Sequence, residues 1–193
     1  MSLITIHRYQ PSLFTLGFFL LGFFSLNLAV TNTAMADNNF NVRNVLYSFQ
    51  DSQLTIFSQL DLTLSNDLIE AVNNGVTISI AIEYAKPKKN LLGTTYDVIA
   101  KSIYEIERHS LSNRYLMRDI NTNKIDIFNS IQAALDNLGR SLKQSIEFKE
   151  QIKELAVRCY VDKFRLPGPL RFKALFSEAW SPSSDWSIWP LNS

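Results

Sequence analysis

Apolar and other residues alternate strictly from position 76 to position 84, which restricts the fold of this part of the chain. One set of alternate positions is β-branched or aromatic, and the other is small or polar with a single charge, Glu83. A period of two is that of a β-strand, whose successive side chains point to opposite faces of the sheet. Because the second face is nearly uncharged, we expect this strand to lie inside the sheet. The apolar set is Val76, Ile78, Ile80, Ile82 and Tyr84.

The segments before this strand show the same alternation. Residues 40–49 and 54–64 predict two strands, and the polar residues 50–53 between them predict a turn, so that the pair forms a hairpin. After the central strand, residues 86–90 contain three lysines and a proline, and we expect a solvated loop there.

The second half of the chain also predicts strands. Residues 96–111 fit both a helical and a β spacing, and we predict a strand because residues 115–117 and 125–128 follow as partners in a meander. We expect residues 140–151 to be irregular and exposed. Residues 152–164 alternate again and predict a long final strand.

Two short helices are predicted between these strands. Ser65 has the chemistry of an N-cap for the first helix, and Gly75 fits its C-terminal end. The second helix covers residues 130–138, and Gly139 is expected to end it. We therefore predict a mainly β fold, an antiparallel β-sandwich-like domain with two short α-helices, with an α+β arrangement as the alternative.

The C-terminal segment after Pro167 and Pro169 is rich in aromatic residues, which a mobile tail is not expected to be. We expect it to fold back over the sheet or its open edge. Its large side chains are either a lid on the core or the wall of a ligand or partner groove. The candidate binding residues are Arg171, Phe176, Trp180, Trp186 and Trp189.

The N-terminal residues predict export. A positive start at His7 and Arg8 precedes an apolar run from position 13, and Ala34-Met35-Ala36 resembles a cleavage site. We predict a signal peptide over residues 1–36 and a single exported domain over residues 37–193, in the periplasm or outside the cell. The alternative is an uncleaved anchor over residues 13–30, which would be the only contact with a membrane.

Charge argues against a nucleic-acid partner. Arg8 is the only one of the 19 Lys and Arg residues that precedes Asp37, so the predicted mature chain balances its 18 Asp and Glu residues. No field of one sign would attract nucleic acid. The single cysteine, Cys159, permits no intrachain disulfide and no cysteine metal framework.

The residues that could carry chemistry have simpler interpretations. His109, the one histidine after Asp37, has no nucleophile or metal-ligand motif around it, so we expect a hydrogen-bonded residue at a strand end. Cys159 lies among apolar residues, where a thiol packs and does not react. Glu105 and Glu107, and Asp119 and Asp126, could form an acid/base pair, but basic neighbours are available to pair with them. We predict no catalytic residue, no metal and no cofactor.

Two motifs carry a resemblance to a known family. Residues 109–115, His-Ser-Leu-Ser-Asn-Arg-Tyr, resemble a hairpin of the bacterial exported family called domain of unknown function 4390. Residues 166–170, Leu-Pro-Gly-Pro-Leu, with Trp180 and Trp186 behind them, resemble its C-terminal signature. The resemblance implies a signal peptide and one β-rich domain in Gram-negative bacteria. It implies no activity, so no functional residue follows from it.

These observations favour a non-catalytic exported protein that binds an envelope protein or a cell-wall component as an accessory or sensing module. The alternative is a periplasmic hydrolase acting on cell-wall material through carboxylates near residues 105–126. Two acidic side chains in a common cleft, away from any Arg or Lys, would favour the hydrolase. Mutation of Trp180 or Trp186 to alanine is expected to weaken partner capture if the first hypothesis holds.

Overall fold

The computed structural model describes residues 40–50, 52–140, 142–147 and 152–191. The predicted signal peptide lies outside this part of the chain. Within it, no helix has both the length and the apolar character needed to cross a bilayer.

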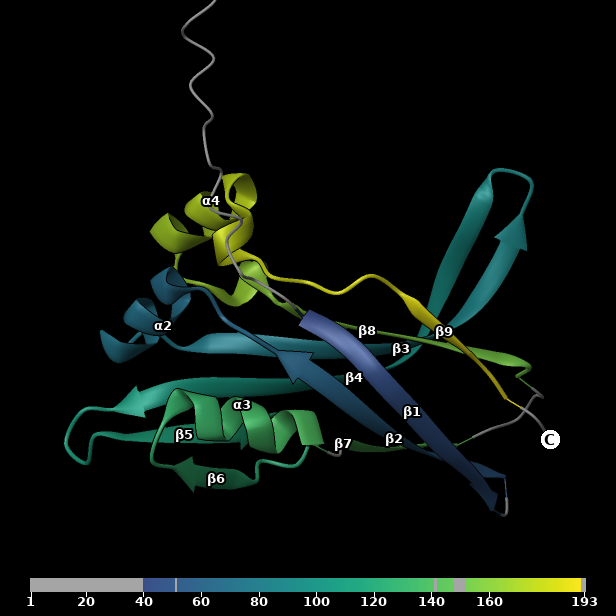
Figure 1. The fold of residues 1–193 in the computed structure, drawn as a ribbon, viewed down its shortest axis with the longest axis horizontal. Coiled ribbons are helices and arrows are strands. Elements are labelled where there is room, and N and C mark those ends of the chain that lie inside the picture. Colours follow the sequence, from purple (N-terminus) through teal and green to yellow (C-terminus); the bar gives the residue numbers. More distant parts are fainter. Residues whose placement is uncertain (1–39, 51, 141, 148–151, 192–193) are drawn as a thin grey trace, which may run out of the picture. The chain divides into compact units, whose positions relative to one another are not determined.

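The larger of two antiparallel sheets has six strands in the order β6-β5-β4-β3-β8-β9 (Figure 1). Its central strand β3 contains most of the alternating segment 76–84, and its residues from Ile78 to Ala85 are all buried. Burial on both faces explains why the segment carries one charge only. The strands are β3 (Ile78–Asn90), β4 (Gly93–His109), β5 (Arg114–Asp119), β6 (Ile125–Phe128), β8 (Glu154–Val161) and β9 (Ser187–Pro190).

The smaller sheet has three strands in the order β1-β2-β7: β1 (Phe40–Gln50), β2 (Gln53–Leu62) and β7 (Leu142–Glu147). Alternate residues of β2 are buried, and β1 contacts β8 of the larger sheet. The predicted mainly β, antiparallel, sandwich-like fold is thus confirmed. The apolar core includes Leu54, Ile56 and Leu60 from the smaller sheet and Ile80, Ile82, Tyr84, Leu155 and Val157 from the larger one.

Helix α2 (Asn66–Asn73) begins as predicted. The Ser65 hydroxyl accepts a hydrogen bond from the backbone N–H of Leu68 at 3.2 Å, which satisfies one of the free donors of the first turn. The chain leaves the helix through Gly75, whose φ of 87° lies in the region that glycine adopts without strain.

Helix α3 (Ile131–Arg140) differs from prediction at its end. Gly139 lies inside the helix and does not stop it. A Cβ atom at this position would lie closer than 3.0 Å to the carbonyl oxygen of Leu60 in β2. The glycine is therefore required by the close approach of the helix to the strand, which local sequence does not reveal.

The predicted loop at residues 86–90 is wrong. Strand β3 continues to Asn90, and this extension pairs with the start of β4, so that a hairpin projects beyond the neighbouring strands (Figure 1). Its outer edge is open because β8 pairs with β3 only from Ile80 to Ala85. Pro87 is tolerated there because an edge position needs no N–H donor on the open side.

Within the region from 140 to 151, residues 142–147 differ from prediction, and residues 141 and 148–151 lie outside the described part of the chain. Residues 142–147 form β7, which adds to β2 in antiparallel register and buries Leu142. The polar side chains that suggested exposure belong to the outer face of an edge strand. The predicted strand at 152–164 is shorter than expected, because β8 ends at Val161 and a 3-10 turn, η1 (Lys163–Arg165), follows.

The C-terminal segment returns to the sheet edge, as predicted. It first forms a third helix, α4 (Gly168–Phe176), which the sequence analysis did not predict, and the 3-10 turn η2 (Glu178–Trp180). It then pairs as β9 with the free edge of β8, Leu155 opposite Trp189. The described part of the chain therefore holds three α-helices instead of two.

Candidate functional site

A cleft of about 480 Å³ lies where the second half of β8 meets the returning C-terminal segment. Residues 182–184, which precede β9 in the chain, run alongside the end of β8 and are held by backbone bonds such as Val161 N–H to Pro182 O at 2.9 Å. These bonds hold serine side chains opposite the end of β8. The lining consists of Lys101, Arg158, Tyr160, Val161, Asp162, Lys163, Phe164, Ser181, Ser183 and Ser184.

Three charged side chains stand side by side across the strands that carry this cleft. Glu83 of β3 is opposite Lys101 of β4 on one side and opposite Arg158 of β8 on the other. Directly opposed residues of antiparallel strands are within reach of each other, so the register alone places a carboxylate between two cations. The Glu83 residue is only 7% exposed, whereas both cations reach the cleft.

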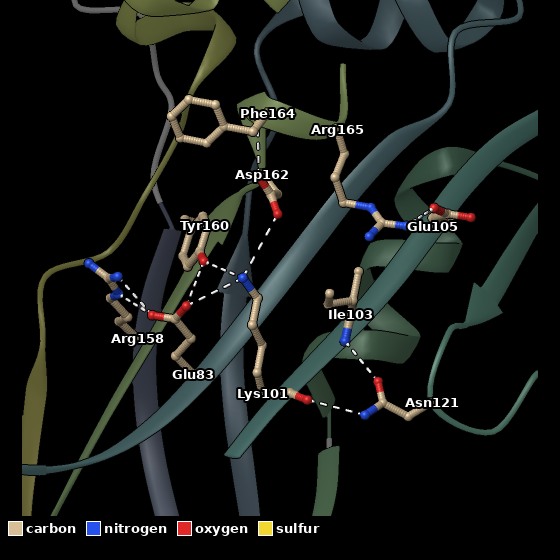
Figure 2. A network of polar contacts seen from close by, with 10 residues as sticks. All are labelled: Glu83, Lys101, Ile103, Glu105, Asn121, Arg158, Tyr160, Asp162, Phe164 and Arg165. Carbon is tan, nitrogen blue, oxygen red and sulfur yellow. Dashed lines mark hydrogen bonds and ion pairs between the residues drawn. The ribbon is translucent and has the colours of Figure 1, made fainter. Parts of the chain in front are cut away.

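Both oxygens of the Glu83 carboxylate are occupied (Figure 2). Arg158 donates from Nε at 2.9 Å and from Nη2 at 2.7 Å to Oε2. Oε1 accepts the Tyr160 hydroxyl at 2.7 Å and lies 3.4 Å from the Lys101 ammonium. A buried charge with this number of charged and hydrogen-bonding partners is compensated.

The Lys101 ammonium links the Glu83 carboxylate to the carboxylate of Asp162. It donates to the Tyr160 hydroxyl at 2.8 Å and lies 3.8 Å from Oδ2 of Asp162. The other Asp162 oxygen accepts the backbone N–H of Phe164 at 3.2 Å and so fixes the start of η1. Asn121 holds the backbone of β4 here, since its side chain donates to the Lys101 carbonyl at 3.2 Å. The network is therefore tied to β3, β4, β8, η1 and the turn between β5 and β6.

The pKa values of these groups move away from neutrality. Burial pushes the pKa of Glu83 upward, but the bonds from Tyr160 and Arg158 and the nearby positive charges outweigh it and lower this pKa. Burial likewise opposes the charge of Lys101, yet Tyr160, Glu83 and Asp162 raise its pKa. Burial raises the pKa of Tyr160, and the Glu83 charge adds to that shift. At neutral pH the carboxylate is therefore ionised, the lysine protonated and the phenol neutral.

Trp186 is the one predicted binding residue that the structure brings to this network. The Arg158 guanidinium lies over the Trp186 ring at 4.5 Å from its centroid and over the Tyr160 ring at 5.0 Å. The Trp186 ring in turn stacks on Tyr96 of the projecting hairpin at 4.5 Å. Cation–π contacts of this kind restrict the rotation of the guanidinium.

The other four predicted binding residues are dispersed. Trp180 is 4% exposed, and its Nε1–H donates to Asp67 of α2 at 3.0 Å, so this ring covers the core. The Trp189 ring packs against the core from β9. Arg171 bonds to a backbone carbonyl of its own segment, and the Phe176 side chain is exposed on α4.

The remaining candidate residues are buried or make contacts within the fold. The His109 ring contacts the Ser112 hydroxyl at 3.0 Å within its hairpin turn. Cys159 is buried, which raises the pKa of its thiol to about 11. Of the acidic residues near the hairpins, Glu105 pairs with Arg165 at 2.8 Å (Figure 2), and Glu107 accepts the Thr77 hydroxyl at 3.2 Å.

The other two acidic residues near the hairpins, Asp119 and Asp126, are also held by hydrogen bonds or ion pairs. Asp119 accepts the backbone N–H of Asn121 at 2.9 Å, and Asp126 pairs with Lys124 at 3.0 Å. Glu105 and Glu107 do line one small depression, but Arg118 lines it as well. Within the described ranges, no three His, Cys, Asp or Glu side chains come together as a metal site would require.

The charged network was not predicted as a site from the sequence. One signal pointed to it: Glu83 is the single charge within the alternating residues 76–84, and a buried carboxylate needs partners. Its partners could not be identified, because Arg158 lies 75 residues further along the chain.

Comparison with known proteins gave one match. No curated protein and no solved structure matched this chain. A family model, described as a domain of unknown function (DUF4390), matches residues 37–190, which include every strand and helix described above. The family predicted from the hairpin and the C-terminal motif is confirmed: the chain belongs to the DUF4390 family.

Proposed function

We propose that this protein is exported to the cell envelope and acts there as a non-catalytic module that binds a partner in the cleft beside β8. Export is supported by the apolar leader with its positive start and its Ala-Met-Ala end. The observation that carries the binding role is the cleft itself, whose walls come from β4, β8, η1 and the C-terminal segment. A site assembled from four segments has a defined shape before any ligand arrives.

The state of the charged groups supports binding over catalysis. A general acid or base works best with a pKa near the working pH. Here the pKa of Glu83 is lowered and those of Lys101 and Tyr160 are raised, so each group keeps its ordinary charge state in neutral solution. Fixed charges held by mutual bonds suit recognition of a ligand.

The alternative of a hydrolase acting through carboxylates near residues 105–126 stays a prediction. The acidic side chains there are each held by a cation, a hydroxyl or a backbone N–H. No contact described above favours this alternative over the binding module.

Site-specific photocrosslinking in intact cells tests the proposal. A photoreactive amino acid replaces Ser183, which is exposed and lines the cleft, and the matched control replaces Asn137, which is exposed on α3. We expect an adduct in the envelope fraction from position 183 and none of that mass from position 137. Without irradiation, the molecule identified in this adduct should be recovered chemically unchanged after prolonged incubation with the protein. Identical adducts from both positions, or turnover of the bound molecule, would contradict the proposal.

A further inference from the structure

We propose that the cleft recognises an oxyanion, a carboxylate or a phosphate group of the ligand, through the outward edge of the Arg158 guanidinium. This inference rests on the proposed function, because it names the chemistry of the ligand that the same cleft binds.

Glu83 uses only part of the hydrogen-bond donors of Arg158. A guanidinium carries five N–H groups, and the bonds to Glu83 use one on Nε and one on Nη2. Figure 2 shows that the guanidinium meets Glu83 by one edge and turns its third nitrogen away from the network. Among the described residues, none accepts a hydrogen bond from Nη1. The Nη1–Nη2 edge is therefore free to bind two oxygens of one carboxylate or phosphate group.

The Arg158 guanidinium is held in place by its neighbours. Glu83 holds the guanidinium through two bonds, and the rings of Tyr160 and Trp186 contact it at 5.0 and 4.5 Å. The Arg158 side chain is nevertheless 37% exposed, so solvent reaches it. Binding to such a side chain costs little conformational entropy, because its position is set before the ligand arrives.

Cations outnumber carboxylates around the cleft. The cations of the cleft are Lys101, Arg158 and Lys163, whereas the carboxylates near it are Glu83 and Asp162. Both carboxylates already neutralise Lys101 and Arg158, and Lys163 has no ion pair within the described part of the chain. One positive charge thus remains to balance an anion. The Ser183 hydroxyl, which makes no side-chain hydrogen bond to a described residue, is a further donor in the cleft, on the segment that pairs with Tyr160.

The test measures binding of three probes to the protein isolated from the envelope fraction with its natural N-terminus. The probes are inorganic phosphate, N-acetyl-trialanine with a free C-terminal carboxylate and the same peptide as its amide, each titrated at constant ionic strength and followed by the NMR signal of the Arg158 Nε–H. We expect saturable shifts with the free-acid peptide or with phosphate, and none with the amide. The free acid acting alone identifies a carboxylate ligand, and phosphate acting alone identifies a phosphate ligand.

Two variants and a matched control complete the test. Arg158→Lys keeps the charge beside Glu83 but removes the Nη1–Nη2 edge that can donate two hydrogen bonds. It should lower the affinity for the probe that binds saturably by about tenfold or more. Lys163→Gln should weaken it by about two- to fivefold, without loss of an ion pair. Arg165→Lys, whose arginine pairs with Glu105 outside the cleft, should bind as the wild type does. Binding to the two variants is followed by the signal of the Ser183 N–H.

The inference is overturned if neither the free-acid peptide nor phosphate gives a saturable shift, or if acid and amide give equal saturable shifts. It is also overturned if sodium chloride reproduces the shifts, or if both Arg158→Lys and Lys163→Gln bind with wild-type affinity. If Arg158→Lys does not fold, Lys163→Gln alone decides between support and refutation. If Lys163→Gln and Arg158→Lys leave the adduct from position 183 unchanged, the inference of an oxyanion ligand is refuted. The proposed function is unaffected by that result. If the otherwise wild-type protein gives no adduct from position 183, the proposed function is refuted, whichever probes bind.

Discussion

Substitution of Gly139 by alanine measures how tightly α3 lies against the smaller sheet. Alanine is the better helix former by about 1 kcal/mol, so local propensity alone predicts a more stable protein. The structure predicts the opposite. The new methyl group would overlap the carbonyl oxygen of Leu60 and lie 3.4 Å from the carbonyl carbon, both of which are backbone atoms.

The size of the effect follows from what has to move. Backbone atoms of β2 cannot rotate away, and β2 is held as the central strand between β1 and β7. Overpacking of this kind costs about 1–3 kcal/mol, and a fixed backbone neighbour places this site at the upper end of that range. After subtraction of the gain in helix propensity, we expect a net loss of about 2 kcal/mol in the free energy of unfolding.

Thermal unfolding followed by circular dichroism checks this value. For a domain of this size, a loss of about 2 kcal/mol lowers Tm by about 4–8 °C. The matched control is Gly168→Ala at the start of α4, where a Cβ atom would meet nothing within 4 Å. We expect the control to change stability by less than about 0.5 kcal/mol. A Gly139→Ala protein with an unchanged or raised Tm would refute the close approach of helix and strand.

Three further outcomes are expected. Glu83→Gln should lower stability at pH 7 by about 2 kcal/mol, because the bonds of Arg158 and Lys101 lose their charged acceptor in a partly exposed network. Because the fold lowers the pKa of Glu83 below its usual 4.5, the ionised carboxylate makes its full contribution to stability above pH 4.5. This contribution is lost as the pH falls through the lowered pKa. The free energies of unfolding of wild type and variant, measured by chemical denaturation, should therefore converge in acid. Cys159, whose pKa is raised to about 11, should resist a thiol reagent at pH 8 until the protein is denatured; rapid labelling of native protein would contradict its burial. Mass spectrometry of the protein from the envelope should place its N-terminus at Asp37, and an intact Met1 would refute cleavage.

The sequence was sufficient to predict those strands whose residues alternate and whose partners are close in the chain. The hairpin of β1 and β2 and the meander of β4, β5 and β6 lie where the alternation and turns place them. Local connections explain this success, because a turn of two to five residues determines which strands pair.

The sequence misled where a distant partner determines the local structure. Residues 86–90 look like a loop, but pairing with the start of β4 keeps them extended. Residues 142–147 lack apolar alternation and still form β7, because the open edge of β2 supplies the hydrogen bonds. Backbone pairing depends on an available edge more than on side chains, and an edge is a property of the assembled sheet.

The candidate site shows the same division. The sequence by itself determined the mainly β antiparallel fold, the capped start of α2 and a single carboxylate, Glu83, within an apolar strand. Only the tertiary structure decided that this carboxylate stands between Lys101 and Arg158, and that Trp186 lies against Arg158 while Trp180 enters the core. The physical reason is that charge and hydrophobicity are properties of single residues, whereas a binding cleft depends on the register between strands far apart in the chain.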